Sequence, residues 1–495
     1  MNGSLAHCTL EAMTKKTPGA LPNREIPYSE AFKKFIPQGW ADDPDYFSEP
    51  VGAAAYTGKR RRAIQKLFAH DRLVIPAGGL KVRSNDCDFR YRPHSGFAYL
   101  TGLGEEIEPD TVLVIESGHA VLYFHARVPR SDPEFYSCAR YGEMWVGARP
   151  SVNEMALRTG LEVRDISELK SVLATDIPEG GKLRIVPGVD EKLEQLVNAL
   201  RGADLTADLE LEKALSEARL IKDDFEITQM DQACAATLVG FEAVIADIPE
   251  AVRRGRGERW VEGIFGLHAR HLGNAIGYDT IAAAGEHACT LHWMQNDGDV
   301  REGDLLLLDA GVEVDTLYTA DITRTFPVSG HFSPAQRQVY EAVLAAQQAG
   351  IDAARPGAKF MDVHNAAVRV VAQYLSEWGI LPVSVKKTLS DKGGEYRRWM
   401  VHGTSHHLGI DVHDCAQARR KLYRGGKLEA GMIITVEPGI YFKSTDLLVP
   451  EELRGIGVRI EDDILITKDG CRVLSADFPR DPDDVEEWMA EVQSR

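Results

Sequence analysis

The sequence predicts a two-domain protein in which a smaller mixed α/β domain precedes a larger domain with antiparallel strands. The chain has 495 residues, which is too long for one hydrophobic core and suits two domains. Strand and helix patterns alternate over about residues 55–200, as in an α/β domain. After residue 222 the strand patterns are longer and favour antiparallel pairing. A helical pattern at 205–222 connects the two parts.

An arm of residues 1–54, rich in Pro, Asp and Lys, is expected to be extended and to pack on a surface through its aromatic side chains. The N-terminal domain is expected over residues 55–204, and its first helix opens at Tyr56. The segment EKLEQLVNAL at 191–200 predicts a second helix. Five segments have the apolar and aromatic composition of strands: LVIPAGG (73–79), FAYLTGL (97–103), VLVIE (112–116), AVLYFHA (120–126) and KLRIVPGVD (182–190).

The connecting segment at 205–222 begins LTADLELEKALSEARL and has apolar residues at helical spacing, with charge pairs four residues apart. After Lys222, the segment DDFEITQMDQACAATLVGFEAVIADI has an Asp at the cap position and an apolar stripe. These two features predict a long helix. This helix opens the second domain, which we expect over residues 223–495.

Composition narrows the class of protein. The formal net charge of −18 argues against a nucleic-acid binder, which needs a basic face. The seven cysteines are scattered and contain no C-x-x-C unit, so we expect neither a disulfide framework nor a thiolate zinc site. A reducing, cytoplasmic location fits this cysteine usage best. We expect no signal peptide and no membrane-spanning helix, because the chain has no suitable apolar run.

The stretch 305–330, LLLLDAGVEVDTLYTADITRTFPVSG, combines apolar strands with two aspartates. Asp309 closes a run of four leucines, and Asp321 lies in the next apolar run. The residues between them predict a β-ribbon that turns back and brings the two carboxylates side by side. Such carboxylates repel each other, and a cation between them turns this cost into binding energy. On the ribbon alone, two strand-end aspartates facing solvent explain the pattern equally well.

Four further stretches hold polar residues in apolar surroundings. Taken singly, each has a structural explanation, such as a hydrogen-bonded core histidine, an acceptor for turn amides or an exposed acidic end. As a set, two Asp, two Glu and one His, each on its own strand or strand end, suit two divalent ions of the Mn, Co, Fe or Zn kind. Two such ions, bridged by carboxylates and a water, supply hydroxide and polarise a carbonyl, so metal-assisted hydrolysis is implied. The stretches are TLHWMQND with His292, WMVHGTSHHLGIDVHD with His402, His406, His407 and His413, MIITVEPGIYF with Glu437, and VRIEDDILIT with Glu461.

The segments DAG…DITRTFPV, HGTSHHLGIDVHD, TVEPGIY and GVRIEDD resemble the metal-binding segments of the pita-bread metallopeptidases, family M24, and best those of its aminopeptidase P (Xaa-Pro aminopeptidase) branch. The resemblance covers about residues 220–480. The segment FRYRPHSGFAYLTGLGEEIEPDTVLVIE at 89–116 is more loosely similar to the N-terminal domain of that family. The resemblance implies an α+β fold, with a C-terminal pita-bread (creatinase/aminopeptidase) domain preceded by a smaller mixed α/β domain.

The resemblance also implies a ligand set for two divalent ions, with Mn²⁺ expected and Co²⁺ or Zn²⁺ as alternatives. Asp309 would bind one metal with both oxygens, and Asp321 and Glu461 would bridge the two metals. His406 and Glu437 would complete the other metal. A hydroxide bridging the metals would be the nucleophile, and Glu437 would relay its proton, first as a general base and then as an acid.

Three histidines resemble the active-site histidines of the family. His413 or His292 would donate a hydrogen bond to the developing oxyanion, and His402 would line the subsite for proline. His407 adjoins His406 on an extended segment, so it is expected to point away from the metals and to be structural.

Three other residues follow from the same resemblance. Arg459 would anchor the site electrostatically, and Tyr278 and Tyr441 resemble tyrosines that support the ligands. The family usually spaces its two aspartates eleven residues apart, whereas Asp309 and Asp321 are twelve apart. The extra residue falls within 313–318, where a longer ribbon tip or a bulge absorbs it.

The implied activity is hydrolysis of the bond between an N-terminal residue and a following proline, by a homodimer or homotetramer. The alternative enzyme is a prolidase, which cleaves Xaa-Pro dipeptides and needs a positive group at the substrate carboxylate. Arg419, Arg420 and Lys421 are candidates for this group, but the sequence does not position them. A non-catalytic protein that binds peptides or histones, and creatinase-like chemistry without metals, are disfavoured because all five ligand positions are intact.

Overall fold

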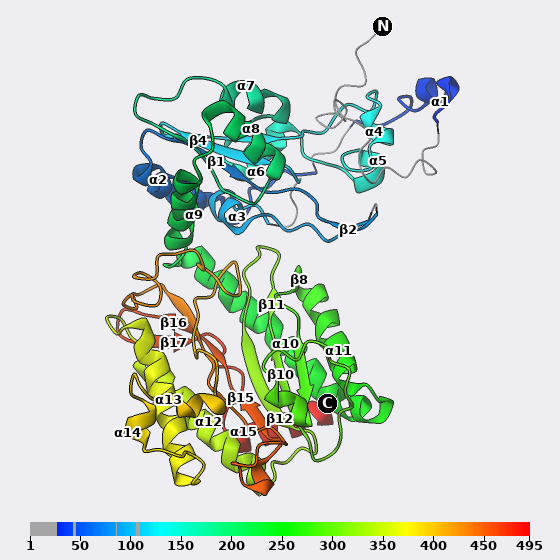
Figure 1. Ribbon diagram of the computed structural model, residues 1–495. Coiled ribbons are helices and arrows are strands. Elements are labelled where there is room, and N and C mark those ends of the chain that lie inside the picture. The colour runs from blue at the N-terminus through cyan, green and yellow to red at the C-terminus, as the bar shows by residue number, and fades with distance from the viewer. Residues whose placement is uncertain (1–26, 43–45, 86, 105–108) are drawn as a thin grey trace. The chain divides into compact units, whose positions relative to one another are not determined.

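A computed structural model describes residues 27–42, 46–85, 87–104 and 109–495, and it separates into two compact units (Figure 1). The N-terminal unit is Met1–Leu215 and the C-terminal unit is Ser216–Arg495. The division falls within helix α9 (Leu205–Ala218), inside the segment that the sequence predicts to be a connecting helix.

The N-terminal unit is built around a mixed five-stranded sheet in the order β6-β5-β4-β1-β7. Strand β4 pairs antiparallel with β1 and β5, whereas the outer strands β7 and β6 pair parallel with β1 and β5. The mixed α/β class of this unit is therefore confirmed. The strands are β1 (Arg72–Pro76), β4 (Val112–Glu116), β5 (His119–Phe124), β6 (Glu162–Asp165) and β7 (Leu183–Ile185), with a separate ribbon of β2 (Val82–Ser84) and β3 (Cys87–Asp88).

One predicted strand of this unit is a helix. The segment FAYLTGL lies in α3 (Ser95–Thr101), all of whose residues are buried. The His94 side chain caps its first turn, and Gly102 ends it in a left-handed conformation. Because every face of α3 is buried, its central residues 97–100 (FAYL) form an apolar and aromatic run without helical periodicity, which makes the segment resemble a buried strand.

The described part of the predicted arm contains helix α1 (Glu30–Phe35), so this part is not simply extended. Tyr28 and Phe32 pack edge-on against Tyr136, with ring centroids 4.9 and 5.2 Å apart. Predictions for residues 1–26 and 43–45 lie outside the described residues. The other helices of this unit are α2 (Ala54–Leu67), α4 (Glu134–Ser137), α5 (Glu143–Val146), α6 (Val152–Thr159), α7 (Leu169–Leu173) and α8 (Glu191–Arg201).

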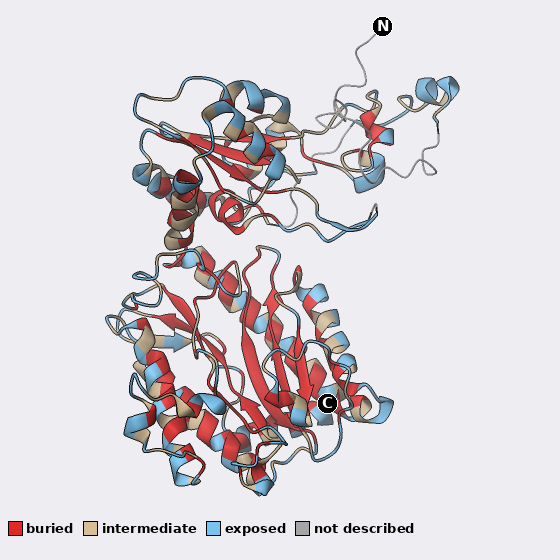
Figure 2. Ribbon diagram, viewed as in Figure 1, coloured by how far each residue is buried: buried red, intermediate tan, exposed pale blue. Residues whose placement is uncertain are grey.

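In the C-terminal unit, small antiparallel sheets lie among long helices (Figure 1). Two helix pairs make most of the helical contacts, α10 with α11 and α12 with α13. Figure 2 shows most of the strands buried, whereas the helices carry one buried and one exposed face. The helices are α10 (Asp224–Arg254), α11 (Gly257–Leu272), α12 (Pro334–Ala353), α13 (Phe360–Glu377), α14 (Val385–Thr388) and α15 (Pro482–Ser494).

The described strands of the C-terminal unit pair antiparallel, as predicted. They are not longer than those of the N-terminal unit, because β10, β12 and β5 each have six residues. The strands are β8 (Ala275–Ile276), β9 (Ile281–Ala284), β10 (Leu305–Ala310), β11 (Val312–Glu313), β12 (Ile322–Pro327), β13 (Ile433–Val436), β14 (Gly439–Tyr441), β15 (Gly457–Arg459), β16 (Asp462–Ile466) and β17 (Cys471–Val473).

The predicted long helix after Lys222 is α10. Asp223 caps it in a reciprocal capping box with Glu226. Within the part of the chain that the structure describes, none of the helices is both long and apolar enough to cross a membrane.

Candidate active site

The antiparallel pair of β10 and β12 brings Asp309 and Asp321 together. Asp309 is opposite Thr323 in the register, one pair away from the end of the ladder. The hydroxyl of Tyr278 lies 2.7 Å from Asp309 Oδ1 and 2.5 Å from Asp321 Oδ1. The ribbon predicted from the sequence therefore turns back, and Leu317 adopts a left-handed conformation (φ 73°) at its tip.

His406 and Glu437 are held beside each other because the segment 404–408 runs along β13. The N–H of Thr435 donates to the His406 carbonyl (3.0 Å), and the N–H of Glu437 donates to the Thr404 carbonyl (3.0 Å). His406 Nε2 lies 3.1 Å from Asp321 Oδ2 and 3.9 Å from Glu437 Oε1. His406 itself is in an irregular segment and not on a strand, which differs from the expectation that each ligand lies on a strand or strand end.

Glu461 lies in a break between β15 and β16, where the sequence predicts one continuous strand. Its N–H donates to the Thr323 carbonyl (3.1 Å), and its Oε2 accepts from the Thr323 hydroxyl (2.6 Å). Arg324, which has no exposed surface, donates to the Glu461 carbonyl (2.7 Å) and to Asp462 (2.8 Å). The break turns the Glu461 side chain toward Asp321 while Arg324 satisfies the carbonyl that leaves the ladder.

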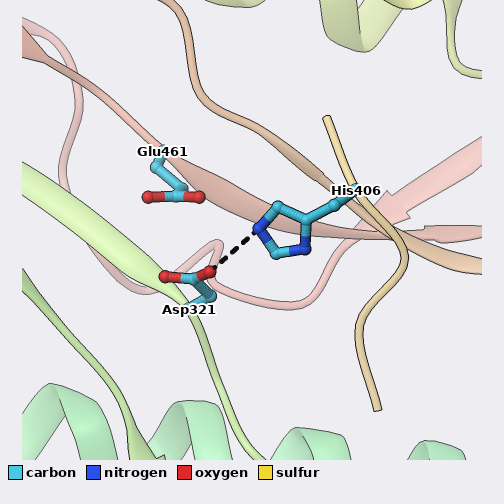
Figure 3. A group of neighbouring side chains, drawn as sticks. All are labelled: Asp321, His406 and Glu461. Atoms are coloured by element: carbon cyan, nitrogen blue, oxygen red, sulfur yellow. Dashed lines mark ion pairs between the residues drawn. The ribbon is translucent and has the colours of Figure 1, made fainter. Parts of the chain in front are cut away.

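One potential ligand atom from each of Asp321, His406 and Glu461 lies within 4.8 Å of the other two. Figure 3 shows the two carboxylates and the imidazole facing one another. Asp309 joins this group through Tyr278, and Glu437 joins it through His406. The structure thus brings together all five side chains that the sequence singles out as ligands.

The charges of this group are not balanced by the protein alone. Burial, together with the charges of Asp321 and Glu437, holds the pKa of Glu461 well above its usual range. Burial also raises the pKa of Asp309. The charge of Arg459 lowers this pKa, but the charge of Asp321 raises it further, and the net shift is upward. Tyr278 has one hydroxyl proton for two carboxylates, so its second short contact needs either a proton on a carboxyl group or a cation nearby. This oxygen-rich donor set with one imidazole fits divalent metal ions.

Arg459 is the one arginine in contact with Asp309 among the described hydrogen bonds. Its Nη2 lies 2.5 Å from Asp309 Oδ2, and its Nη1 donates to the Tyr441 hydroxyl at 3.1 Å. The Arg459 side chain is 4% exposed, so this charge acts in a medium with little screening. Arg459 therefore holds both Asp309 and Tyr441 in place.

His402 lies on the other side of Glu437. Its Nδ1 is 2.7 Å from the Gly403 carbonyl and 3.5 Å from Glu437 Oε2, and its Nε2 is 2.8 Å from the Tyr441 hydroxyl. A carbonyl only accepts, so Nδ1 carries the proton, and in the neutral ring Nε2 accepts from Tyr441. Burial raises the pKa of Tyr441 to about 12, against the charge of Arg459.

His413 lies beside His406. The ring of His413 is 4.5 Å from that of His406, edge to face. Burial and the charge of His406 lower the pKa of His413, and the charge of His292 contributes in the same direction. For His406, burial lowers the pKa, but the hydrogen bond to Asp321 and the charges of Asp321 and Glu437 together outweigh burial and raise the pKa to about 9. His292 itself is exposed.

Other predicted residues lie apart from this group. His407 is 1% exposed, and its ring stacks on Phe360 with centroids 5.2 Å apart. Of the three basic candidates for a carboxylate-binding group, Arg419 pairs with Glu217 at 2.6 Å, and Arg420 and Lys421 are exposed.

Sequence reasoning missed Arg324, which binds the backbone of Glu461. Its only sequence signal is a charged residue inside the run ITRTFP, whose six residues are all buried. A charge at such a position is costly unless it is paired, but the pattern does not identify its partners, because they lie more than 130 residues away.

Comparison with known proteins gives consistent findings. Residues 228–468 match metallopeptidase family M24, and residues 56–185 match the aminopeptidase P N-terminal domain. The chain is 49% identical over 469 residues to Xaa-Pro aminopeptidase 1 of Streptomyces coelicolor, covering 94% of this chain and 93% of the relative. It is 32% identical over 457 residues to the Xaa-Pro aminopeptidase of Escherichia coli, covering 90% and 99%.

Solved structures give the same result for the fold. The structure of Pseudomonas aeruginosa aminopeptidase PepP superposes with a TM-score of 0.78 at 30% identity, covering 89% of this chain and 99% of that one. A variant of Escherichia coli aminopeptidase P in complex with substrate superposes with a TM-score of 0.77, with the same identity and coverage.

Proposed function

The chain belongs to metallopeptidase family M24 and is a metallo-aminopeptidase with the aminopeptidase P fold. We propose that it removes the N-terminal residue from peptides whose second residue is proline. The observation that carries the proposal is the group of Asp321, His406 and Glu461, whose potential ligand atoms lie within 4.8 Å of one another. Asp309 shares the Tyr278 hydroxyl with Asp321, and Glu437 lies beside His406. Relatives that match over nearly the whole chain carry the Xaa-Pro aminopeptidase name.

Divalent metal cofactors follow from the family. We propose that the five convergent side chains hold two ions, with Mn²⁺ as the expected metal because most of the donors are carboxylate oxygens. When bound, these ions supply a Lewis acid for the scissile carbonyl and make a water acidic enough to attack at neutral pH. They would also neutralise the repulsion that raises the pKa values of Asp309 and Glu461.

Glu437 is the side chain proposed to move the proton. It is only partly buried, and its two oxygens face His406 and His402 at 3.9 and 3.5 Å. A carboxylate in this position accepts the proton of the attacking water and later gives it to the leaving proline nitrogen. His402 keeps its Nδ1 proton on the Gly403 carbonyl, so it is not poised to take this proton from Glu437.

His413 and His292 are proposed to bind the substrate on the side of the site opposite His402. The pKa of His413 is lowered by burial and by the charge of His406, so its ring is neutral at neutral pH and still has one N–H to donate. Such a donor stabilises negative charge that develops on the carbonyl oxygen in the transition state. His402 and Tyr441 are proposed to line the proline subsite, and Tyr278 supports the ligands from behind.

A preference for proline needs a shaped subsite, because the proline ring fixes φ and leaves no N–H to bind. The test is hydrolysis of matched Xaa-Pro-Yaa tripeptides, Xaa-Ala-Yaa tripeptides and Xaa-Pro dipeptides by metal-free protein supplied with Mn²⁺, Co²⁺ or Zn²⁺. We expect cleavage of Xaa-Pro-Yaa only. Preferential cleavage of the dipeptides would favour a prolidase, and no cleavage of any peptide with any metal would refute the proposal.

We further propose a homodimer or homotetramer, as the resemblance to the family implies, and a cytoplasmic location, which the cysteine usage favours. The division at Leu215 and Ser216 supports the proposed order of an N-terminal α/β domain (55–204), a helical connector (205–222) and a catalytic domain (223–495). Size-exclusion chromatography with light scattering measures the assembly directly, and a monomer at micromolar concentration would contradict this part of the proposal.

A further inference from the structure

Glu258 is a buried carboxylate outside the residues assigned to the reaction. It is the second residue of α11, and it has no exposed surface. Its Oε1 accepts from the Ala284 N–H (2.8 Å) and from His287 Nδ1 (2.7 Å). Its Oε2 accepts from Trp293 Nε1 (2.8 Å) and from the Gly298 N–H (2.7 Å). Both oxygens are therefore saturated with donors from one short segment.

That segment, residues 284–298, leaves the end of β9 and carries His292 between its anchored residues. The ring of Trp293, directly after His292, stacks on the ring of His287 with centroids 3.9 Å apart and planes 25° apart. Trp293 also packs against the buried cluster that contains Tyr441. His292 is exposed, so its own packing does not fix it, and its position depends on the anchors on either side.

A carboxylate accepts all four bonds when His287 is the tautomer that carries its proton on Nδ1. A glutamine of the same size keeps one acceptor oxygen but presents an amide N–H₂ to two of the four donors. Either orientation of the amide would leave a pair of N–H groups in a buried position without an acceptor, which is costly. The N-terminus of α11 also favours a negative charge at this position.

We propose that Glu258 is a positioning residue that holds the 284–298 segment so that His292 faces the reacting carbonyl. This inference rests on the proposed function, in which His292 contributes to oxyanion or substrate binding. Glu258 does not touch substrate in this arrangement. It acts by removing the freedom of a loop whose displacement by about 1 Å would cost on the order of 10²-fold in rate.

The first test is a double-mutant cycle of Glu258→Gln and His292→Ala, measured with an Xaa-Pro-Yaa tripeptide. We expect Glu258→Gln to lower kcat/KM by about 10- to 100-fold in the wild-type background. In the His292→Ala background the same substitution should change kcat/KM by no more than about twofold, because its target is already gone. Equal losses in both backgrounds, or full activity of either single variant, would overturn the proposal.

The second test is hydrogen exchange of the 284–298 segment, which needs no activity. Glu258→Gln should speed exchange at Ala284 and Gly298 while leaving α12 and α13 unchanged. Unchanged exchange would overturn the proposal even if the protein hydrolyses peptides. If Glu258→Gln speeds exchange but the wild-type protein hydrolyses no peptide, the proposed function is wrong and the anchoring of the segment by Glu258 is not. Trp293→Phe removes a single donor and should give a smaller change of the same kind if Glu258→Gln folds poorly.

A matched control is Glu486→Gln. Glu486 also accepts from a histidine Nδ1 and from a backbone N–H, those of His331 and Phe332 (2.7 and 2.9 Å). The segment that it holds carries none of the proposed site residues. This variant perturbs one histidine bond and one backbone bond, at a side chain that is 19% exposed, and it should leave kcat and KM unchanged. A loss like that of Glu258→Gln would overturn the positioning role.

Discussion

The side chains grouped at the candidate active site carry more negative charge than the basic residues around them neutralise. Four carboxylates meet there, those of Asp309, Asp321, Glu437 and Glu461. Among the described ion pairs, Arg459 pairs with Asp309, and two histidines are potential cations: His406 beside Asp321 and Glu437, and His402 beside Glu437. Buried carboxylates in this number are costly without cations. Burial together with this excess raises the pKa of Glu461, and the excess explains the fit of the site to divalent ions.

Glu437→Gln tests the proton relay. An amide keeps the size of the side chain and a metal-binding oxygen but accepts no proton from water, so kcat should fall by about 10²- to 10⁴-fold. The fold should be unchanged, because Glu437 is partly exposed and its N–H bonds to Thr404 through the backbone. Steady-state kinetics and circular dichroism measure the two effects. Wild-type turnover in this variant would remove Glu437 from the mechanism.

Tyr278→Phe tests the support of the two aspartates. The variant removes a hydroxyl that lies within 2.7 Å of both carboxylates and keeps the aromatic ring. Groups that orient ligands typically contribute about 10- to 100-fold to metal affinity, and we expect a loss in this range. Titration of the metal-free variant with Mn²⁺ measures the affinity. An unchanged affinity would contradict the supporting role.

The sequence identifies the candidate ligands because each is a polar residue in an apolar segment, as with Asp309 after four leucines and Glu461 within VRIEDDILIT. It does not identify Arg324 or Glu258. Arg324 binds mainly backbone carbonyls, and Glu258 binds two backbone N–H groups and two side chains. The partners outside their own strand or helix lie 26 to 155 residues away. A pattern along the chain contains no information about such distances, so these residues become visible only in the folded structure.

At the level of elements, antiparallel pairing positions the site. The ladder of β10 and β12 sets the two aspartates, and the segment 404–408 along β13 sets His406 against Glu437. Strand patterns in the sequence predict the ladder, because β10 and β12 are apolar and bounded by turn residues. They do not predict the break before Glu461 or helix α3, since in both places tertiary burial overrides the local pattern.

A buried ion network joins the histidine segment to the start of the C-terminal unit. Asp414 directly follows His413, and it accepts from Arg219 Nε (3.0 Å) and Lys222 Nζ (3.2 Å). The side chains of Asp414 and Lys222 are 1% and 0% exposed. Burial alone would raise the pKa of Asp414, but the charges of Arg219 and Lys222 outweigh it and lower the pKa from 3.8 to about 2.

The pKa of Asp414 predicts a pH-dependent effect of Asp414→Asn. Since its pKa is lower in the folded protein, the charged carboxylate stabilises the fold above pH 3.8, and this stabilisation is lost as the pH falls toward 2. At pH 7 the variant should lose about 3–5 kcal/mol in the free energy of unfolding, because two buried cations lose their partner. The difference from wild type should narrow by on the order of 2 kcal/mol between pH 4 and 2.

Urea unfolding of both proteins over this pH range measures the difference. Asp231→Asn is the matched control, because Asp231 pairs with Arg472 at the surface, where the two side chains are 42% and 46% exposed. Exposed pairs of this kind contribute little, so the control should stay close to wild type at every pH. A gap between wild type and Asp414→Asn that is independent of pH would contradict the lowered pKa of Asp414.

At the scale of the whole molecule, one of the two compact units contains all the proposed metal ligands and the other contains none. All five proposed ligands lie in the C-terminal unit, on segments between residues 309 and 461. The sequence predicts this division from chain length and from the connecting helix, and it predicts the order of the two domains from the resemblance. Neither length nor pattern gives the residue at which the division falls, because α9 is one continuous helix across it.

Metal removal should therefore destabilise one unit selectively. Ions bound only by the folded C-terminal unit add about 2.7 kcal/mol at a free concentration of 100 Kd, which corresponds to about 5 °C in Tm for a unit of this size. Scanning calorimetry with Mn²⁺ and with EDTA should show one transition that moves and one that does not. Asp208→Asn, which removes the partner of Arg201 (2.9 Å) and of the Ile185 N–H (2.9 Å) in the N-terminal unit, should move the other transition. If EDTA shifts neither transition, the five side chains do not hold metal in the folded protein.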